Sequence, residues 1–169
     1  IFRDSGEPVA FGGRILPGSK DPAKYKNSPE TAIYAKSKTL YGLNWAKAEI
    51  VTADEVIVCE GYTDVIGFHR SGVRRAVATC GTALTEDHVR LLKRFAKKVV
   101  LAFDADSAGQ GAAARFYEWE QRYKVEVGVA HFPQGKDPGD LANSDPGELA
   151  KAVASAQPFL GFRLQRVLD

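Results

Sequence analysis

One stretch of the sequence joins a buried strand to two acidic residues. Residues 99–103 (Val-Val-Leu-Ala-Phe) are all apolar, which is typical of a strand that is covered on both faces. Asp104 and Asp106 follow at once. In an extended chain, side chains two residues apart point to the same side, about 6.5–7 Å from each other. Two carboxylates this close repel each other, so we expect a proton or a cation between them.

The neighbouring residues repeat one structural unit. Apolar strands are predicted at 55–60, 75–80, 98–103 and 124–132, and helices at 63–71, 85–96 and 107–123. Thr63, Thr85 and Ser107 are suited to cap these three helices. Such alternation predicts right-handed crossovers and a parallel sheet between layers of helices. The fold class is therefore α/β, with a mainly parallel four-stranded sheet flanked by helices.

The residues outside this core are less regular. Residues 1–30 contain many Gly and Pro and are predicted to form short strands and a loop. A short helix is predicted at 40–48, and further helices are predicted after Asp145 and after Pro158. We therefore divide the chain into a partial basic N-terminal subdomain (1–52), an α/β core (53–143) and an incomplete C-terminal helical segment (144–169).

The composition limits the class of protein. With 169 residues, of which 44% are hydrophobic and 26% charged, the chain is long enough for a domain with a sizeable core. No apolar run reaches the roughly 18–20 residues of a membrane helix, and no signal peptide is visible. Cys59 and Cys80 are isolated, which predicts reduced thiols in a cytoplasmic protein. The chain begins Ile-Phe-Arg and contains no Met, so we expect it to be a piece of a longer protein.

Positive charge is concentrated near the N-terminus. The formal net charge is only +2, but residues 1–50 contain eight Lys or Arg against five Asp or Glu. Cationic, aromatic and amide side chains alternate at Lys24, Tyr25, Lys26 and Asn27. This mixture suits contacts with phosphates and bases, and Lys36 and Lys38 extend the basic surface. Without further support, a solvated polar loop is the preferred interpretation.

Acidic residues also follow other predicted strands. Glu60 ends the first strand, and Asp137 and Asp140 come just after the fourth. Because the carboxyl ends of parallel strands share one edge of a sheet, these acids are expected to meet Asp104 and Asp106 there. Carboxylate oxygens select hard cations, which predicts Mg²⁺, with Mn²⁺ as a substitute, and phosphoryl or nucleotidyl chemistry through two ions about 3.5–4 Å apart. Asp140 is equally well explained as a helix cap.

Two other functions fit the same residues. A receiver-type phospho-acceptor domain also carries acids at the ends of parallel strands, and it would need a Lys such as Lys136 nearby. A nucleic-acid-binding module without catalysis would use the acids only as helix caps. Tight binding of more than one divalent ion would favour a polymerase or a nuclease over both.

The sequence also resembles a known family. Glu60–Ile66 (Glu-Gly-Tyr-Thr-Asp-Val-Ile) and Asp104–Gly109 (Asp-Ala-Asp-Ser-Ala-Gly) are similar to the Toprim fold of primases, topoisomerases and related nucleases. Lys24–Thr31 (Lys-Tyr-Lys-Asn-Ser-Pro-Glu-Thr), together with Leu40–Leu43 and Lys136–Pro138, resembles the bacterial DnaG-type DNA primases in particular. The resemblance covers nearly the whole chain in the right order.

This resemblance implies the catalytic part of a primase RNA polymerase domain, which makes short RNA primers on single-stranded DNA from ribonucleoside triphosphates. It implies that the catalytic acids of the metal site are Glu60, Asp104 and Asp106, joined by Asp137 and supported by Asp64. It implies that template and nucleotide are handled by Arg14, Lys24, Tyr25, Asn27, Lys36 and Lys38. Family members often have Asp-Pro-Asp where this chain has Asp-Pro-Gly at 137–139, which leaves a ligand role for Asp140 open.

The resemblance also implies partners and a location. The partners are the single-stranded template, the RNA–DNA primer duplex, and the replicative helicase through a domain outside this chain. Zinc is expected only in another domain outside it, no membrane partner is expected, and the location is the bacterial cytoplasm at the replication fork. The isolated chain is expected to bind metal and nucleotide but to prime poorly. Another Toprim enzyme, a topoisomerase or a nuclease, is the alternative.

Overall fold

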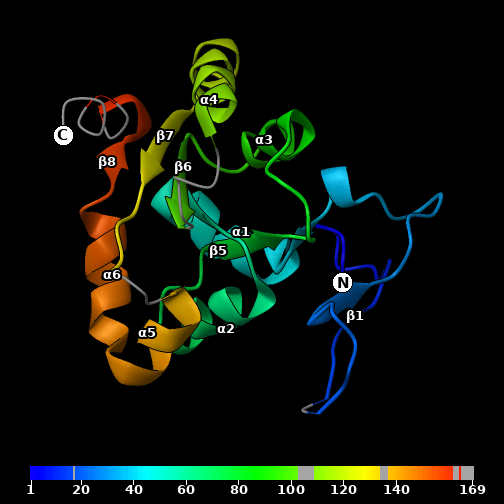
Figure 1. The fold of residues 1–169 in the computed structure, drawn as a ribbon. Coiled ribbons are helices and arrows are strands. Elements are labelled where there is room, and N and C mark those ends of the chain that lie inside the picture. Colours follow the sequence, from blue (N-terminus) through cyan, green and yellow to red (C-terminus); the bar gives the residue numbers. More distant parts are fainter. Residues whose placement is uncertain (17, 103–108, 134–136, 162–163, 165–169) are drawn as a thin grey trace.

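The computed structural model describes residues 1–16, 18–102, 109–133, 137–161 and 164, and for 109–114 the backbone alone (Figure 1). The helices are α1 (Leu43–Ala53), α2 (Tyr62–Arg70), α3 (Glu86–Leu92), α4 (Gly109–Tyr123), α5 (Pro138–Ser144) and α6 (Pro146–Ala154). The strands are β1 (Gly12–Arg14), β2 (Tyr25–Asn27), β3 (Leu40–Tyr41), β4 (Glu55–Cys59), β5 (Ala76–Thr79), β6 (Lys98–Ala102), β7 (Glu126–Val129) and β8 (Gln157–Pro158). A 3₁₀ turn, η1, spans Lys36–Lys38.

A six-stranded sheet forms the centre of the described molecule. Its strand order is β3-β5-β4-β6-β7-β8, and the four central strands are parallel to one another. β3 and β8 pair antiparallel with β5 and β7 at the two edges. The predicted parallel four-stranded arrangement is therefore confirmed for the centre, but the sheet is wider than predicted. Each edge strand has only two residues, which is too short to show a period of two in the sequence.

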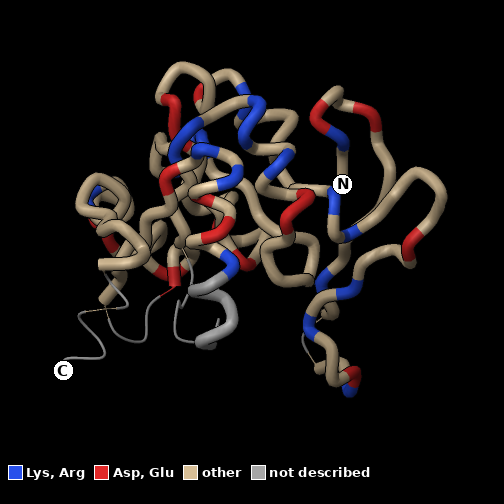
Figure 2. Tube along the Cα trace, turned by 90° about the horizontal axis from the view of Figure 1, so that it is seen from above, with Lys and Arg blue, Asp and Glu red and all other residues tan. Residues whose placement is uncertain are grey.

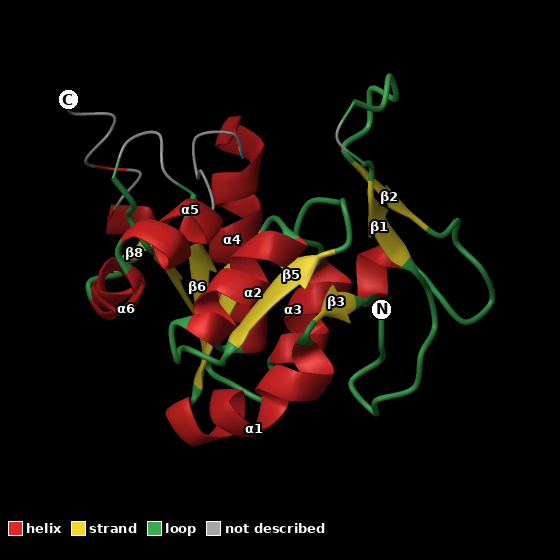
Figure 3. Ribbon diagram, turned by 90° about the horizontal axis from the view of Figure 1, so that it is seen from below, coloured by secondary structure: helices red, strands yellow, loops and turns green. Residues whose placement is uncertain are grey.

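Helices cover both faces of this sheet (Figure 3). Apolar side chains of α1, α3 and α4, such as Ile50, Leu92 and Phe116, are buried in one core. Those of α2, α5 and α6, such as Phe68 and Leu141, are buried in a second core on the other face. β4 and β6 lie between the two cores. The prediction that the apolar run is covered on both faces is confirmed for residues 99–102, each of which is at most 1% exposed.

The N-terminal segment forms a hairpin beside the sheet rather than within it (Figure 1). β1 pairs antiparallel with β2, and Arg14 lies opposite Tyr25. The helix predicted at 40–48 is wrong at its start, because Leu40 and Tyr41 form β3. Gly42, with a φ of 84°, turns the chain from this strand into α1, and α1 then continues to Ala53. This left-handed φ favours glycine over residues with a side chain.

The predicted helix starts are confirmed in one case and wrong in another. The Thr85 side chain caps α3, as predicted. Thr63 does not cap α2, because the capping position is Gly61, two residues earlier. The N–H of Gly61 donates to the Asp64 carboxylate at 3.1 Å, and a charged acceptor binds an N–H more strongly than a hydroxyl does. The predicted cap Ser107 lies outside the described residues.

The described residues of the C-terminal part form helices and one short strand. The helix predicted after Asp145 is α6, with Pro146 in its first position. Pro158 lies in β8, and residues 159–161 directly after it are helical. Helix α3 ends at Leu92, earlier than predicted. Among the helices that the structure describes, none is long and apolar enough to cross a membrane.

Candidate metal and nucleic-acid site

Glu60 lies at the carboxyl end of the central strand β4. The parallel register places Cys59 of β4 beside Ala102 of β6, so both strands end at the same edge of the sheet. The Glu60 residue is exposed, whereas the four residues before it are fully buried. Asp104 and Asp106 follow β6 in the sequence, but they lie outside the described residues. The sheet therefore brings Glu60 to the edge from which the chain continues towards these two acids.

Asp64 joins two loops near this edge. Its carboxylate accepts a hydrogen bond from the N–H of Gly61 at 3.1 Å and another from the N–H of Gly139 at 3.2 Å. The side chain is buried, with 8% of the residue exposed. The pKa of Asp64 is raised from 3.8 to about 6, mainly by burial and also by the negative charges of Asp137 and Glu60, while the two N–H groups oppose the rise. Two other carboxylates, Asp137 and Glu60, thus act electrostatically on Asp64.

Asp137 and Asp140 lie at the start of α5. The Asp137 side chain accepts from the N–H of Asp140 at 2.7 Å and therefore caps the helix. Asp140 is an exposed residue of the first turn and does not cap this helix, so of its two predicted roles the ligand role stays a prediction. A Cβ on Gly139 would lie 3.2 Å from an oxygen of Asp137 and 3.4 Å from an oxygen of Asp64. The side of Gly139 on which a larger residue would carry its side chain is therefore occupied by two carboxylates.

The donor set at this edge suits a hard dication. The candidate side chains are all carboxylates, and carboxylate oxygens are the ligands that Mg²⁺ prefers. The charges of Asp137 and Glu60 disfavour the charged form of Asp64, and a nearby cation would relieve this repulsion. Within the described ranges, no three His, Cys, Asp or Glu side chains converge enough to hold a metal ion by themselves. Asp104 and Asp106 are outside those ranges.

The hairpin carries cationic and aromatic side chains together. Lys and Arg are spread along this N-terminal segment, which projects from the body of the molecule (Figure 2). The Arg14 guanidinium lies 5.9 Å from the centre of the Tyr25 ring, and the Tyr25 ring meets the Tyr62 ring edge-on at 6.2 Å. Lys24 is exposed beside them. An exposed cation over an aromatic ring fits a surface that contacts phosphates and stacks a base.

Asn27 fastens the hairpin to the α/β part of the chain. Its amide nitrogen donates to the carbonyl of Cys80 at 2.9 Å, and its amide oxygen accepts from the Tyr62 hydroxyl at 2.7 Å. Tyr62 directly follows the Glu60-Gly61 turn. Both ends of the Asn27 amide therefore have partners inside the chain, and its contact with nucleic acid stays a prediction.

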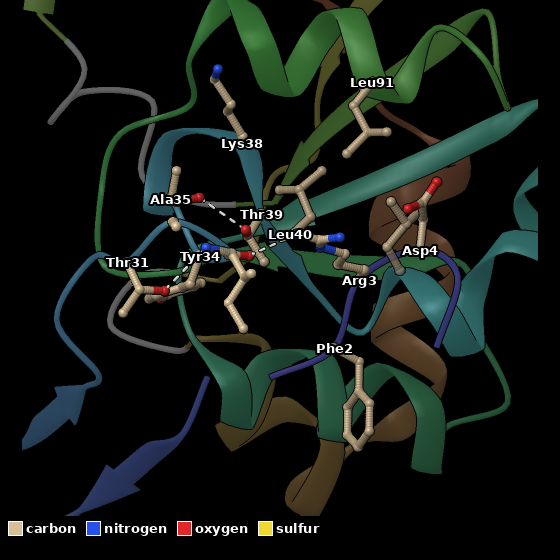
Figure 4. Close-up of a pocket in the computed structure, with 13 residues that line it drawn as sticks. Phe2, Arg3, Asp4, Thr31, Tyr34, Ala35, Lys38, Thr39, Leu40 and Leu91 are labelled. Atoms are coloured by element: carbon tan, nitrogen blue, oxygen red, sulfur yellow. Dashed lines mark hydrogen bonds between the residues drawn. The ribbon is translucent and has the colours of Figure 1, made fainter. Parts of the chain in front are cut away.

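Lys36 and Lys38 lie on η1, which packs against α3. Lys36 is half-buried and Lys38 is exposed. A cavity of about 350 Å³ opens beside this turn, and Arg3, Lys38 and Leu91 are among the residues that line it (Figure 4). Its described lining contains none of the candidate acids. The contacts that hold η1 in place were not predicted from the sequence. The spacing of Thr85 and His88, three residues apart at a helix start, is a recognisable signal because it matches the spacing of a capping box.

The comparisons with known proteins agree with this arrangement. A model of the Toprim-like family matches residues 57–142, just over half of the chain. A model of the DNA primase catalytic core, N-terminal domain, matches residues 1–47. The chain therefore belongs to the Toprim-like family.

Within this family, its relatives are DNA primases, so the DnaG-type resemblance is confirmed. The primase of Campylobacter jejuni is 47% identical over 162 residues, which are 95% of this chain and 27% of that protein. The primase of Streptomyces coelicolor is 42% identical over 170 residues, which are 96% of this chain and 26% of that protein. The chain thus spans about a quarter of the length of these relatives.

Solved structures show the same fold. The RNA polymerase domain of the Mycobacterium tuberculosis primase DnaG has a TM-score of 0.87 and 36% identity, over 98% of this chain and 57% of that one. A DnaG primase catalytic domain bound to single-stranded DNA has a TM-score of 0.83 and 34% identity, over 99% of this chain and 53% of that one. The chain corresponds to about half of these catalytic domains.

Proposed function

We propose that this chain is a catalytic-core part of a primase, which joins ribonucleotides into short RNA primers on a single-stranded DNA template. The observation that carries the proposal is the shared edge at which β4 and β6 end: Glu60 follows β4 there, and the charges of Glu60 and Asp137 both act on the buried Asp64. The similarity to primase domains, one of them bound to single-stranded DNA, supports it. Ribonucleoside triphosphates and the primer duplex are proposed partners, and the helicase is a proposed partner of the longer protein.

Mg²⁺ is the proposed cofactor, with Mn²⁺ as a substitute. The acids proposed to hold it are Glu60, Asp104, Asp106 and Asp137, and Asp140 is a further candidate. Such an ion would lower the pKa of the attacking 3′-hydroxyl and would neutralise charge that develops on the phosphate. The bond that forms joins this hydroxyl oxygen to the α-phosphorus of the next nucleotide, and the bond to pyrophosphate breaks.

Other residues of the chain contribute position and charge. Asp64 holds the Gly61 turn and Gly139 together, which fixes the backbone that carries Glu60 and Asp137. Lys24 and Arg14 offer positive charge to the phosphates of template or nucleotide, and Tyr25 offers a ring face for stacking.

The proposed metal-binding role of the acids is tested by substitutions in the longer protein that contains this chain. Asp104→Asn and Asp106→Asn are expected to abolish primer synthesis on single-stranded DNA while circular dichroism and the unfolding temperature stay the same. Glu60→Gln is expected to behave alike. Asp145→Asn is the control, because Asp145 is an exposed acid at the start of α6 and Asn is also a good N-cap. Full activity of an acid variant contradicts the site, and DNA cleavage without synthesis by the wild type would favour the nuclease alternative.

A further inference from the structure

The first turn of α3 holds a buried histidine with both ring nitrogens engaged. His88 is fully buried. Its Nδ1 lies 3.2 Å from the backbone nitrogen of Thr85, and its Nε2 lies 2.9 Å from the carbonyl oxygen of Lys36. Because the Thr85 N–H donates, Nδ1 must be unprotonated, and Nε2 therefore carries the hydrogen and donates to Lys36. His88 is thus a neutral bridge between α3 and η1.

Side chains satisfy three consecutive carbonyl groups of this region. The Thr85 hydroxyl donates to the carbonyl of Ser37 at 2.6 Å, next to the His88 bond to Lys36. The Thr39 hydroxyl donates to the carbonyl of Ala35 at 2.9 Å (Figure 4). The Ala35 carbonyl also accepts from the Lys38 N–H at 3.0 Å, whereas the carbonyls of Lys36 and Ser37 are at the end of a short helix, where the helix itself supplies no partner. The backbone of η1 is therefore fixed largely by α3.

The two lysines on this turn are available to a ligand. The ion pairs that the structure describes include neither Lys36 nor Lys38. The backbone N–H of Lys36 donates to the Glu30 carboxylate at 2.9 Å, which fixes the other side of the turn. Fixed backbone with uncommitted ammonium groups is the arrangement that a phosphate-binding position needs.

We propose that Thr85 and His88 are positioning residues, which hold η1 so that Lys36 and Lys38 meet phosphate groups of the bound template or nucleotide. This inference rests on the proposed function, in which these lysines belong to the basic surface. It adds that α3, which carries none of the candidate acids or basic-surface residues, sets the geometry of two of the cations.

Two substitutions at one position separate the two bonds of His88. Gln is long enough for its amide nitrogen to donate to the Lys36 carbonyl, whereas Asn can accept from the Thr85 N–H but does not reach Lys36. In the longer protein, His88→Asn is expected to raise the Kd for single-stranded DNA, or the KM for ribonucleoside triphosphates, about threefold to tenfold, the scale of one lost hydrogen bond. His88→Gln is expected to stay close to the wild type. A change in the Kd for DNA would show that the lysines contact a template phosphate, and a change in the KM would show that they contact a nucleotide phosphate.

A double-mutant cycle tests the route of the effect. If His88 acts through the two lysines, His88→Asn adds little once Lys36→Ala and Lys38→Ala are both present. Amide hydrogen exchange at residues 36–38 is expected to be faster in His88→Asn than in His88→Gln. Additive effects, or a lower kcat with unchanged Kd and KM, overturn the inference alone. Unchanged affinity and KM in Lys36→Ala combined with Lys38→Ala overturn the role of the lysines in the proposed function as well.

A second pair of variants covers the case in which His88→Asn does not fold. Thr85→Val removes the bond to the Ser37 carbonyl, and Thr85→Ser keeps it. The inference expects weaker binding or a higher KM for Thr85→Val only. Equal behaviour of the two variants would overturn it.

Discussion

Two buried titratable residues, Asp64 and His88, respond to burial in opposite directions. Asp64 is a buried carboxylate among other carboxylates, so its charged form is disfavoured and its pKa is raised to about 6. His88 is buried away from water, so burial lowers its pKa and keeps it neutral. The two residues therefore predict pH effects of opposite sign.

Asp64 is expected to make the fold relatively more stable in mild acid. The folded state binds its proton more tightly than the unfolded state, so its contribution to the free energy of unfolding rises as the pH falls from about 6 towards 3.8. Asp64→Asn lacks this gain. Urea denaturation with a chelator at pH 7 and pH 5 is expected to show the wild type improving relative to the variant. Parallel pH profiles would contradict the raised pKa.

His88 is expected to make the fold relatively less stable in mild acid. Its pKa is lowered in the folded state, so its contribution is complete above the ordinary value of 6.5 and is lost as the pH falls below it. A proton on Nδ1 would also face the donating N–H of Thr85. The unfolding free energy of His88→Gln, measured by urea denaturation, is expected to fall less than that of the wild type between pH 7 and pH 5. An equal fall in both would show that His88 does not titrate as inferred.

At the scale of elements, the contact between α2 and α5 sets how closely Asp64 approaches Gly139. A Cβ on Gly67 would lie 2.9 Å from the Cβ of Ala142 and 3.2 Å from the carbonyl of Pro138. Gly67→Ala is therefore expected to push the helices apart and to lower the free energy of unfolding by about 1–3 kcal/mol. Gly161→Ala is the control, since in the described part of the chain nothing except its own local backbone and chain neighbours lies within 4 Å of its added methyl. Urea denaturation measures the free energy of unfolding of both variants. An unchanged value for Gly67→Ala would mean that the helices separate at little cost.

The sequence predicts the elements with long patterns better than those with short ones. Buried β4 and β6, and the Thr85 cap of α3, follow from apolar runs and a capping residue. The edge strands β3 and β8 have two residues each, and their pairing depends on distant segments. No local sequence pattern therefore predicts them. Gly42 separates β3 from α1 by a turn that periodicity alone does not resolve.

The candidate site is predictable in part for the same reason. Glu60 follows from its place after an apolar strand in a parallel sheet. The bond between Asp64 and Gly139 spans 75 residues and depends on how two helices pack, which the sequence does not encode locally. The contacts of Thr85 and His88 with η1 are also remote in sequence, across 48 and 52 residues.

At the scale of the whole molecule, binding of nucleic acid has to depend on where the charge lies, because the formal net charge is only +2. Lys24→Ala in the longer protein is expected to weaken single-stranded DNA binding and to reduce the slope of log affinity against log salt by about 0.7. Lys97→Ala is the control, because Lys97 precedes β6 at the opposite edge of the sheet and pairs with Asp54. Titrations at several salt concentrations measure both, and equal slopes would remove Lys24 from the interface.

The two-residue strands at the flanks of the sheet also affect how shorter versions of this chain behave. Pro158 has no N–H, so β8 is a poor template for pairing with another strand. It therefore protects this edge of the sheet against pairing with a second molecule. A gene fragment that stopped after Ala154 would uncover Gly128 and Val129 of β7, which β8 normally pairs. Such a fragment would expose β7 as an unpaired edge strand and would tend to aggregate during purification. Expression boundaries therefore belong beyond Pro158.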